Sequence, residues 1–163
     1  LPKEFTDRLH PNPETAFERK TVLMLSSLKE YKGTREFIEL AEKLPQYKFV
    51  LVINDSEENI NNYLAANKLH DLTGGVNLTI YPRQADVTSF YNTATIVIVL
   101  TNSRQAVETF GLTALEAMSA GLPYLSDTSW SLRGSVIRSP FRALMDTCKS
   151  GVTSPEANFS FTS

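Results

Sequence analysis

Two glutamates, Glu108 and Glu116, stand eight positions apart in the run ETFGLTALEAMSAGLP, which ends at Pro123. The β-branched stretch 96–100 comes shortly before this run and is typical of a buried parallel strand. A strand followed by a polar loop, a glycine and a helix can hold an anion, because the first amides of a helix lack internal partners. Gly111 would let the backbone approach a phosphate closely.

Glu116 is the only charged residue between Glu108 and Asp127, and its neighbours are those of a packed helix. A carboxylate in that position needs hydrogen-bond donors or water, and the paired hydroxyls of a ribose would serve as donors. Glu108 lies earlier, in the loop, where it could reach a second polar group of a ligand. The residues alone slightly favour a plainer interpretation, in which Glu116 faces solvent and Glu108 interacts only with the helix dipole.

The whole run from Glu108 to Pro123 resembles the signature of retaining glycosyltransferases with the GT-B fold. The closest group is family 4, the glycosyl transferases group 1. A second block, VLMLSSLKEYKG over residues 22–33 followed by FIELA over 37–41, is similar to the first strand and helix of that family's donor-binding domain. The resemblance covers about residues 18 to 125, and the two blocks stand in the family's order.

The resemblance implies a role for each residue of the predicted site. Glu116 would bind the ribose hydroxyls of a nucleoside diphosphate sugar, and Glu108 would contact the sugar that is transferred. Lys32 would pair with the diphosphate, so Glu108 and Lys32 are the predicted catalytic residues. The predicted donor-binding residues are Ser27, Lys32, Phe110, Gly111, Leu112, Thr113 and Glu116, with backbone amides near Gly111 holding phosphate and sugar hydroxyls.

The chain departs from the family in the loop after the first expected strand. The family usually has Gly-Arg where this chain has Ser26 and Ser27, so one bidentate phosphate clamp is missing. Lys29 could compensate, but a solvated loop lysine is the simpler interpretation. Arg83 follows the third expected strand and could stack on the nucleotide base, although we favour an ordinary loop charge there.

Length and composition fit one small domain in a reducing compartment. The 163 residues can bury a sizeable core, and a net charge of −2 gives no general attraction to nucleic acid or anionic membranes. The single cysteine, Cys148, excludes an internal disulfide. No apolar run approaches a transmembrane segment, and the first residues do not resemble a signal peptide. We therefore expect a cytoplasmic protein, with peripheral membrane attachment left open for the full-length enzyme.

Apolar stretches and helical patterns alternate along the chain. Strands are expected at 21–25, 47–53, 76–81, 96–100 and from 122, and helices at 33–44, from 55 toward 69, at 86–93 and after Gly111. Asp55 and Glu58 resemble a capping box for the second of these helices. The alternation predicts an α/β fold with a Rossmann-like, doubly wound parallel sheet, which would be one half of a GT-B fold.

The chain divides into three expected parts: a linker-like lead-in over 1–19, a nucleotide-sugar-binding domain over 20–126, and an atypical tail over 127–163. In the tail, serine, threonine, arginine and proline become frequent, and hydrophobic periodicity fades. Truncation or a change of reading frame near Pro123 would explain the loss of the family pattern. A naturally divergent tail is the alternative.

The resemblance implies transfer of a hexose from a nucleoside diphosphate sugar to a hydroxyl on a sugar, a lipid-linked acceptor or another molecule. Retention of configuration is expected, without a metal or other cofactor. The acceptor domain would be a missing N-terminal domain, so the chain alone should not transfer sugar at a useful rate. A non-catalytic nucleotide-sugar-binding or regulatory domain is the alternative. A phosphoacceptor receiver domain is rejected, because residues 26–27 and 81–82 lack the aspartates that it needs.

Overall fold

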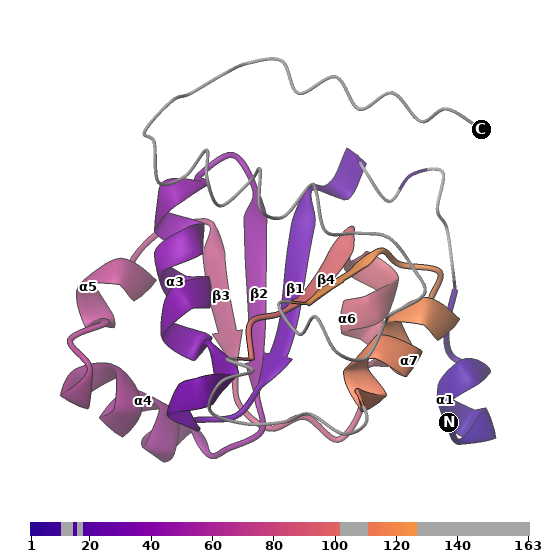
Figure 1. The fold of residues 1–163 in the computed structure, drawn as a ribbon, viewed down its shortest axis with the longest axis horizontal. Helices are drawn as coiled ribbons and strands as arrows, with labels where there is room; N and C mark the ends of the chain where they lie inside the picture. The colour runs from indigo at the N-terminus through magenta and orange to yellow at the C-terminus, as the bar shows by residue number, and fades with distance from the viewer. Residues whose placement is uncertain (11–14, 16–17, 102–110, 127–163) are drawn as a thin grey trace. The chain divides into compact units, whose positions relative to one another are not determined.

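The computed structural model describes residues 1–10, 15, 18–101 and 111–126. Within them, five parallel strands form one sheet in the order β3-β2-β1-β4-β5. Figure 1 shows β1 to β4 side by side. The strands are β1 (Thr21–Ser26), β2 (Lys48–Ile53), β3 (Leu78–Tyr81), β4 (Ile96–Val99) and β5 (Tyr124–Ser126). The predicted doubly wound α/β fold is therefore confirmed.

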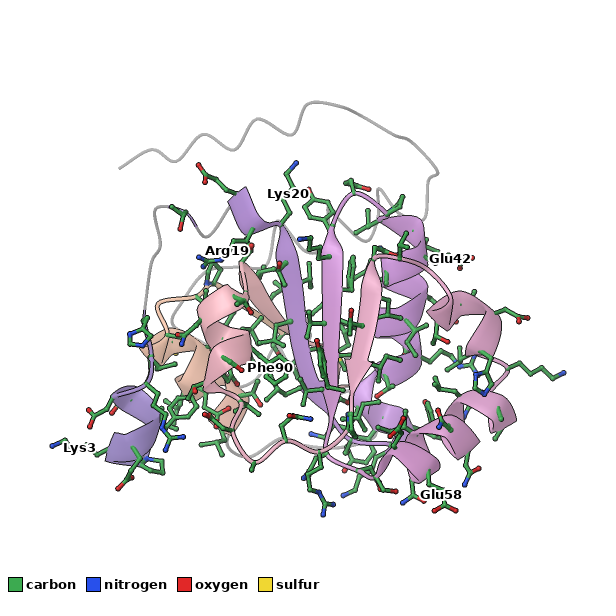
Figure 2. All side chains as sticks on the ribbon, turned by 180° about the vertical axis from the view of Figure 1, so that it is seen from behind. Lys3, Arg19, Lys20, Glu42, Glu58 and Phe90 are labelled. Atoms are coloured by element: carbon green, nitrogen blue, oxygen red, sulfur yellow. The ribbon has the colours of Figure 1, made fainter. Side chains whose placement is uncertain are left out.

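Helices connect these strands on both faces of the sheet. They are α3 (Thr34–Lys43), preceded by the 3-10 turn η1 (Glu30–Lys32), then α4 (Glu57–Ala66), α5 (His70–Thr73), α6 (Thr88–Thr93) and α7 (Leu112–Ser119). α3 lies in front of the strands in Figure 1, whereas α6 lies in front in Figure 2, which is seen from behind. In the described part of the chain, no helix combines the length and apolar character needed to cross a membrane.

The two faces of the sheet have separate apolar contacts. On the α3 face, the Phe37 ring packs edge-on against the ring of Phe49 on β2, with centroids 5.3 Å apart. On the other face, one buried cluster joins the sheet to α6, α7 and the N-terminal residues. It contains Leu9, Leu23, Val52, Tyr91, Ala94, Val97, Ala117, Ala120 and Leu122. Burial of these apolar side chains is the main force that holds α6 and α7 to the strands.

The predicted lead-in contains a short helix, α1 (Lys3–Thr6), and the residues after it pack on α6. The side chain of Asn92 accepts a hydrogen bond from the amide of His10 at 2.8 Å and donates one to the carbonyl of Arg8 at 2.9 Å. These bonds attach the first residues to the helix that precedes β4. The domain boundary at residue 19 stays a prediction.

The start of α4 differs from the prediction by one residue. Ser56, not Asp55, is the N-cap, and its hydroxyl accepts from the amide of Asn59 at 3.2 Å. Asp55 instead accepts from the amide of Ser56 and the side chain of Asn59, at 2.8 and 2.6 Å. The expected capping box therefore does not form. The helix also ends at Ala66, earlier than expected, and Lys68 then takes a positive φ of 55° that an α-helix cannot contain.

Asp86 fixes the start of α6. Its carboxylate accepts hydrogen bonds from the amide and the hydroxyl of Thr88, at 3.0 and 2.7 Å, and pairs with Arg8 at 3.1 Å. The two bonds from Thr88, with a smaller contribution from Arg8, hold the pKa of Asp86 below its usual value. This carboxylate therefore stabilises the folded chain in its ionised form.

We expect Asp86 to contribute to the loss of stability in acid. A group with a lowered folded-state pKa contributes stability above its unfolded pKa of about 3.9, and this contribution disappears as pH falls through the lower folded value. In urea denaturation from neutral pH down to about pH 2, the free energy of unfolding of Asp86→Asn should therefore fall less steeply than that of the unmodified chain. Asp71→Asn is the control, because Asp71 is exposed on α5. If the free energy of unfolding falls equally with pH in the unmodified chain and in Asp86→Asn, this expectation is wrong.

Candidate functional site

The strand order changes direction between β1 and β4, which lie next to each other at the middle of the sheet. From β1 the chain continues toward β2 and β3 on one side, and from β4 it continues toward β5 on the other. Doubly wound sheets bind ligands outside the carboxyl ends of the strands at such a switch point. The loops after β1 and β4 therefore mark the place where a ligand is expected.

Most of the predicted site residues lie at these two loops or at the helix that follows the second of them. Those that the structure describes are Ser27, Lys32, Gly111, Leu112, Thr113 and Glu116. Glu108 and Phe110 lie outside the described residues. The role of every one of these residues stays a prediction.

Gly33 brings the loop after β1 into contact with the end of β4. Its φ is +72°, and a Cβ built on it would lie 2.4 Å from both the Cβ and the carbonyl oxygen of Leu100. Leu100 directly follows β4, so the loop that carries Lys32 presses against the point where the chain leaves that strand. Only glycine satisfies both the left-handed backbone angle and the close approach.

Two lysines flank Tyr31 in the loop after β1. Lys29 Nζ lies 5.8 Å and Lys32 Nζ lies 5.7 Å from the centroid of the Tyr31 ring, within the range of cation–π attraction. Lys29 is exposed, as expected for a loop lysine, whereas Lys32 is half-buried. The loop therefore carries Lys29 as a second cation in addition to Lys32.

The serine pair in place of Gly-Arg is part of a hydroxyl network. Ser26 Oγ lies 3.0 Å from Oγ1 of the buried Thr34. The carbonyl oxygen of Ser27 is the acceptor for these two hydroxyls, at 3.2 and 3.3 Å. These contacts connect the end of β1 to the first residue of α3. Ser27 thus contributes to the shape of the loop, but it adds no positive charge.

α7 begins at Leu112, with Gly111 as its N-cap, so the predicted start of a helix directly after Gly111 is confirmed. Among the described residues, no side-chain hydrogen bond caps this end, and no acceptor is found for the amides of Leu112 and Thr113. The Gly111 carbonyl accepts from the amides of Ala114 and Leu115, at 2.9 and 3.2 Å. The first amides and the helix dipole together make this end favourable for an anion.

Glu116 is half-buried on the second turn of α7, and its Oε2 accepts a hydrogen bond from the Tyr91 hydroxyl at 2.6 Å. Burial raises the pKa of the Tyr91 phenol far above its ordinary value, and the Glu116 carboxylate raises it further. The phenol therefore stays protonated and remains a donor near neutral pH. Sequence reasoning missed this partner, because Tyr91 lies 25 positions earlier and has the pattern of an ordinary core aromatic.

Arg83 is held by the loop after β2. Its Nε donates to the side-chain oxygen of Asn54 at 2.8 Å, and its amide donates to the carbonyl of Asp55 at 2.9 Å. The guanidinium therefore joins the loops after β2 and β3. This contact supports the interpretation of Arg83 as a loop charge.

A polar cavity of about 350 Å³ lies beside the loop after β1, on the side of α3 and α4. Its lining residues are Glu30, Tyr31, Gly33, Arg35, Glu36, Tyr63, Asn67 and Leu100. None of the predicted site residues that the structure describes lines it, although Gly33 and Leu100, where the loop after β1 meets the end of β4, do. In the described ranges, no group of three or more His, Cys, Asp or Glu residues could hold a metal ion.

The family described as "Glycosyl transferases group 1" matches residues 6–137 of the chain. The matched stretch contains both sequence blocks and every predicted site residue. No curated protein matches the chain in sequence.

Solved structures of similar fold include a glycosyltransferase from Rickettsia africae ESF-5, with a TM-score of 0.61 and 16% identity over 90% of this chain and 44% of that chain. Anabaena HepE, solved in complex with UDP and glucose, has a TM-score of 0.56 and 20% identity over 74% of this chain and 35% of its own. Sucrose-phosphate synthase from Thermosynechococcus elongatus has a TM-score of 0.50 and 20% identity over 81% of this chain and 35% of its own. The chain thus spans less than half of each protein, and at these identities the similarity shows the fold alone.

Proposed function

The chain belongs to the glycosyl transferases group 1, and we propose that it is the donor-binding domain of a retaining, family 4 hexosyltransferase with the GT-B fold. Its ligand would be a nucleoside diphosphate sugar, bound at the switch point between β1 and β4. The full-length enzyme would transfer the hexose to a hydroxyl of a sugar, a lipid-linked molecule or another acceptor. We place this reaction in the cytoplasm, with peripheral attachment to a membrane as an option for the full-length enzyme.

The observation that carries this proposal is the start of α7, where the amides of Leu112 and Thr113 have no acceptor among the described residues. α7 follows β4 and the loop with Lys32 follows β1, and these two strands are neighbours in the sheet. The amides of Leu112 and Thr113 are suited to the oxygens of a diphosphate, and Lys32 would supply positive charge. Glu116, one turn further along α7, would accept hydrogen bonds from ribose hydroxyls. UDP is bound in the solved HepE structure, so UDP is the first nucleotide to test on this chain.

The proposed chemistry depends on charge that develops on the diphosphate. When the bond between sugar and phosphate breaks, negative charge grows on the leaving group, and Lys32 and the α7 amides would stabilise that charge most strongly in the transition state. Glu108 would orient the transferred sugar. We propose no metal or other cofactor for this reaction.

The acceptor site and the water-excluding side of the cleft would come from an N-terminal domain outside this chain. We keep the proposed donor-binding domain at 20–126, with the lead-in over 1–19 and the atypical tail over 127–163. A frame change or truncation near Pro123 remains our proposal for that tail. Sequencing the encoding DNA tests it, because a frame change requires the family pattern to continue in a neighbouring frame for dozens of codons.

We expect the purified chain to be stabilised by one of UDP, GDP and ADP. A ligand at a hundred times its Kd adds about 2.7 kcal/mol to the free energy of unfolding, which raises Tm by about 5–10 °C in a domain of this size. Glu116→Ala should reduce the shift. Glu42→Ala should not, because Glu42 is exposed near the end of α3, away from the carboxyl ends of the strands (Figure 2). No shift with any diphosphate would contradict the proposed function.

Activity separates the enzyme from a non-catalytic binding domain. The full-length enzyme should release nucleoside diphosphate only when an acceptor is present, and NMR of the product should show the anomeric configuration of the donor. The isolated chain should bind the donor but release almost no nucleoside diphosphate. Binding without transfer by the full-length enzyme would favour the non-catalytic alternative, and an inverted product would contradict the retaining mechanism.

A further inference from the structure

We propose that Tyr91 is a positioning residue for Glu116: its hydroxyl holds one carboxylate oxygen, so that the other is kept for the two ribose hydroxyls of the donor. This inference rests on the proposed function, because it concerns how Glu116 meets the nucleotide. Tyr91 itself would not touch the ligand. It would act only through the side chain of Glu116.

The hydrogen bond from Tyr91 uses only one of the two carboxylate oxygens of Glu116. The distance from the Tyr91 hydroxyl to Glu116 Oε2 is 2.6 Å, which is typical of a hydroxyl donating to an ionised carboxylate. Among the described residues, no other hydrogen bond or ion pair to this carboxylate is found. Oε1 therefore keeps its acceptor capacity for a ligand.

Tyr91 is a rigid anchor for this bond. Its side chain is 1% exposed and belongs to the buried cluster that joins α6 and α7 to the sheet. The ring of Phe5 packs edge-on against it, with centroids 5.8 Å apart and an interplanar angle of 81°. A ring packed in this way fixes the position of its hydroxyl, because a tyrosine has few side-chain torsions to vary.

Glu116 is the flexible member of the pair. It is half-buried on α7 and has three side-chain torsions, so without a partner its carboxylate would sample several positions. Holding it before the ligand arrives reduces the ordering cost of binding. The bond joins α6, which precedes β4 in the chain, to α7, which follows it. The position of the carboxylate therefore depends on how both helices pack.

A purely structural role is the competing explanation, because a buried tyrosine hydroxyl needs an acceptor whether or not a ligand binds. The two roles differ in which ligands they affect. A positioning role concerns only ligands that carry ribose hydroxyls. A structural role would alter the binding of all nucleotides to the same degree.

The test compares UDP with 2′,3′-dideoxy-UDP by calorimetry, on the natural chain and on Tyr91→Phe, which keeps the ring. We expect Tyr91→Phe to weaken UDP binding by about three- to tenfold and to leave the affinity for dideoxy-UDP unchanged. Equal losses for both ligands, or no loss for either, would overturn the proposal while leaving the donor site intact. If UDP does not bind, GDP and ADP with their dideoxy forms replace it. Failure of all three would overturn the proposed function, and this inference with it.

Two further variants complete the design. In the background of Glu116→Ala, Tyr91→Phe should cause no additional loss of UDP affinity, because its effect passes through the missing carboxylate. An additional loss of the original size would overturn the proposal. Tyr47→Phe is the matched control, because it removes a phenol hydroxyl from a tyrosine that is 38% exposed, beyond the end of α3. Urea denaturation establishes that each variant is folded before binding is measured.

Discussion

Replacing Gly33 with alanine is expected to abolish stable folding of the domain. The backbone of Gly33 is left-handed, and the added Cβ would lie 2.4 Å from the backbone oxygen of Leu100, which has no room to move without displacing the end of β4. Left-handed backbone costs a non-glycine residue about 1–2 kcal/mol, and the clash adds to it, for a total of at least about 3 kcal/mol. Urea denaturation followed by circular dichroism measures this loss.

Gly111→Ala is the control for this experiment. Its φ is −78°, and an added Cβ would lie 3.3 Å from the Cβ of Ala114, a contact that a small shift relieves. Alanine is a poorer N-cap than glycine, so a loss of about 1 kcal/mol or less is expected. If Gly33→Ala proved as stable as Gly111→Ala, the loop after β1 would not be in close contact with Leu100 at the end of β4.

Replacing Lys32 with alanine in the full-length enzyme is expected to lower kcat by about a hundredfold or more, with a much smaller change in KM. Removing one group that stabilises developing charge costs about that much in other enzymes. Lys32 should act mainly on the leaving diphosphate in the transition state, so turnover should fall more than donor affinity. Steady-state kinetics with saturating acceptor measures both constants.

Two other lysines serve as comparisons for Lys32. Lys29 lies near the same tyrosine ring, so Lys29→Ala should have a smaller effect in the same direction. Lys43→Ala should have none, because Lys43 is exposed at the far end of α3. A higher KM with unchanged kcat in Lys32→Ala would mean that this lysine binds ground state and transition state equally, contrary to the proposed role.

The sheet could be predicted from local patterns. Runs such as 48–53 and 96–99 are nearly all apolar and rich in β-branched residues, as strands buried on both faces of a parallel sheet must be. α3 could be predicted because Phe37, Leu40 and Ala41 recur at helical spacing, and all three are buried. The doubly wound parallel sheet could be predicted from the alternation of strands and helices, because right-handed crossovers leave few possible topologies.

The failures lie where a single residue decides the outcome. The cap of α4 belongs to Ser56 because its hydroxyl reaches the amide of Asn59, a choice that a pattern centred on Asp55 does not distinguish. The early end of the same helix is accompanied by the positive φ of Lys68, a residue type that rarely adopts this angle. Local energies of about 1 kcal/mol separate such alternatives, so composition alone does not select between them.

Some features of the candidate site could be predicted from the sequence, and others could not. The family and the start of α7 could be predicted, because a contiguous run of residues carries both. The approach of Gly33 to Leu100 and the bond from Tyr91 to Glu116 could not, because each joins residues that are far apart in sequence. Such contacts exist only after the sheet has assembled, and no local periodicity encodes them.

The most direct test of a donor site at the switch point is an NMR titration of the ¹⁵N-labelled chain with UDP. We predict that the amides of Leu112 and Thr113 show the largest shift changes, followed by that of Lys32, because these groups lie at the start of α7 and in the loop after β1. Amides of α5 should not change. Changes confined to the polar cavity, at residues such as Tyr63 and Asn67, or no changes at all, would contradict a donor site formed by α7 and the loop after β1.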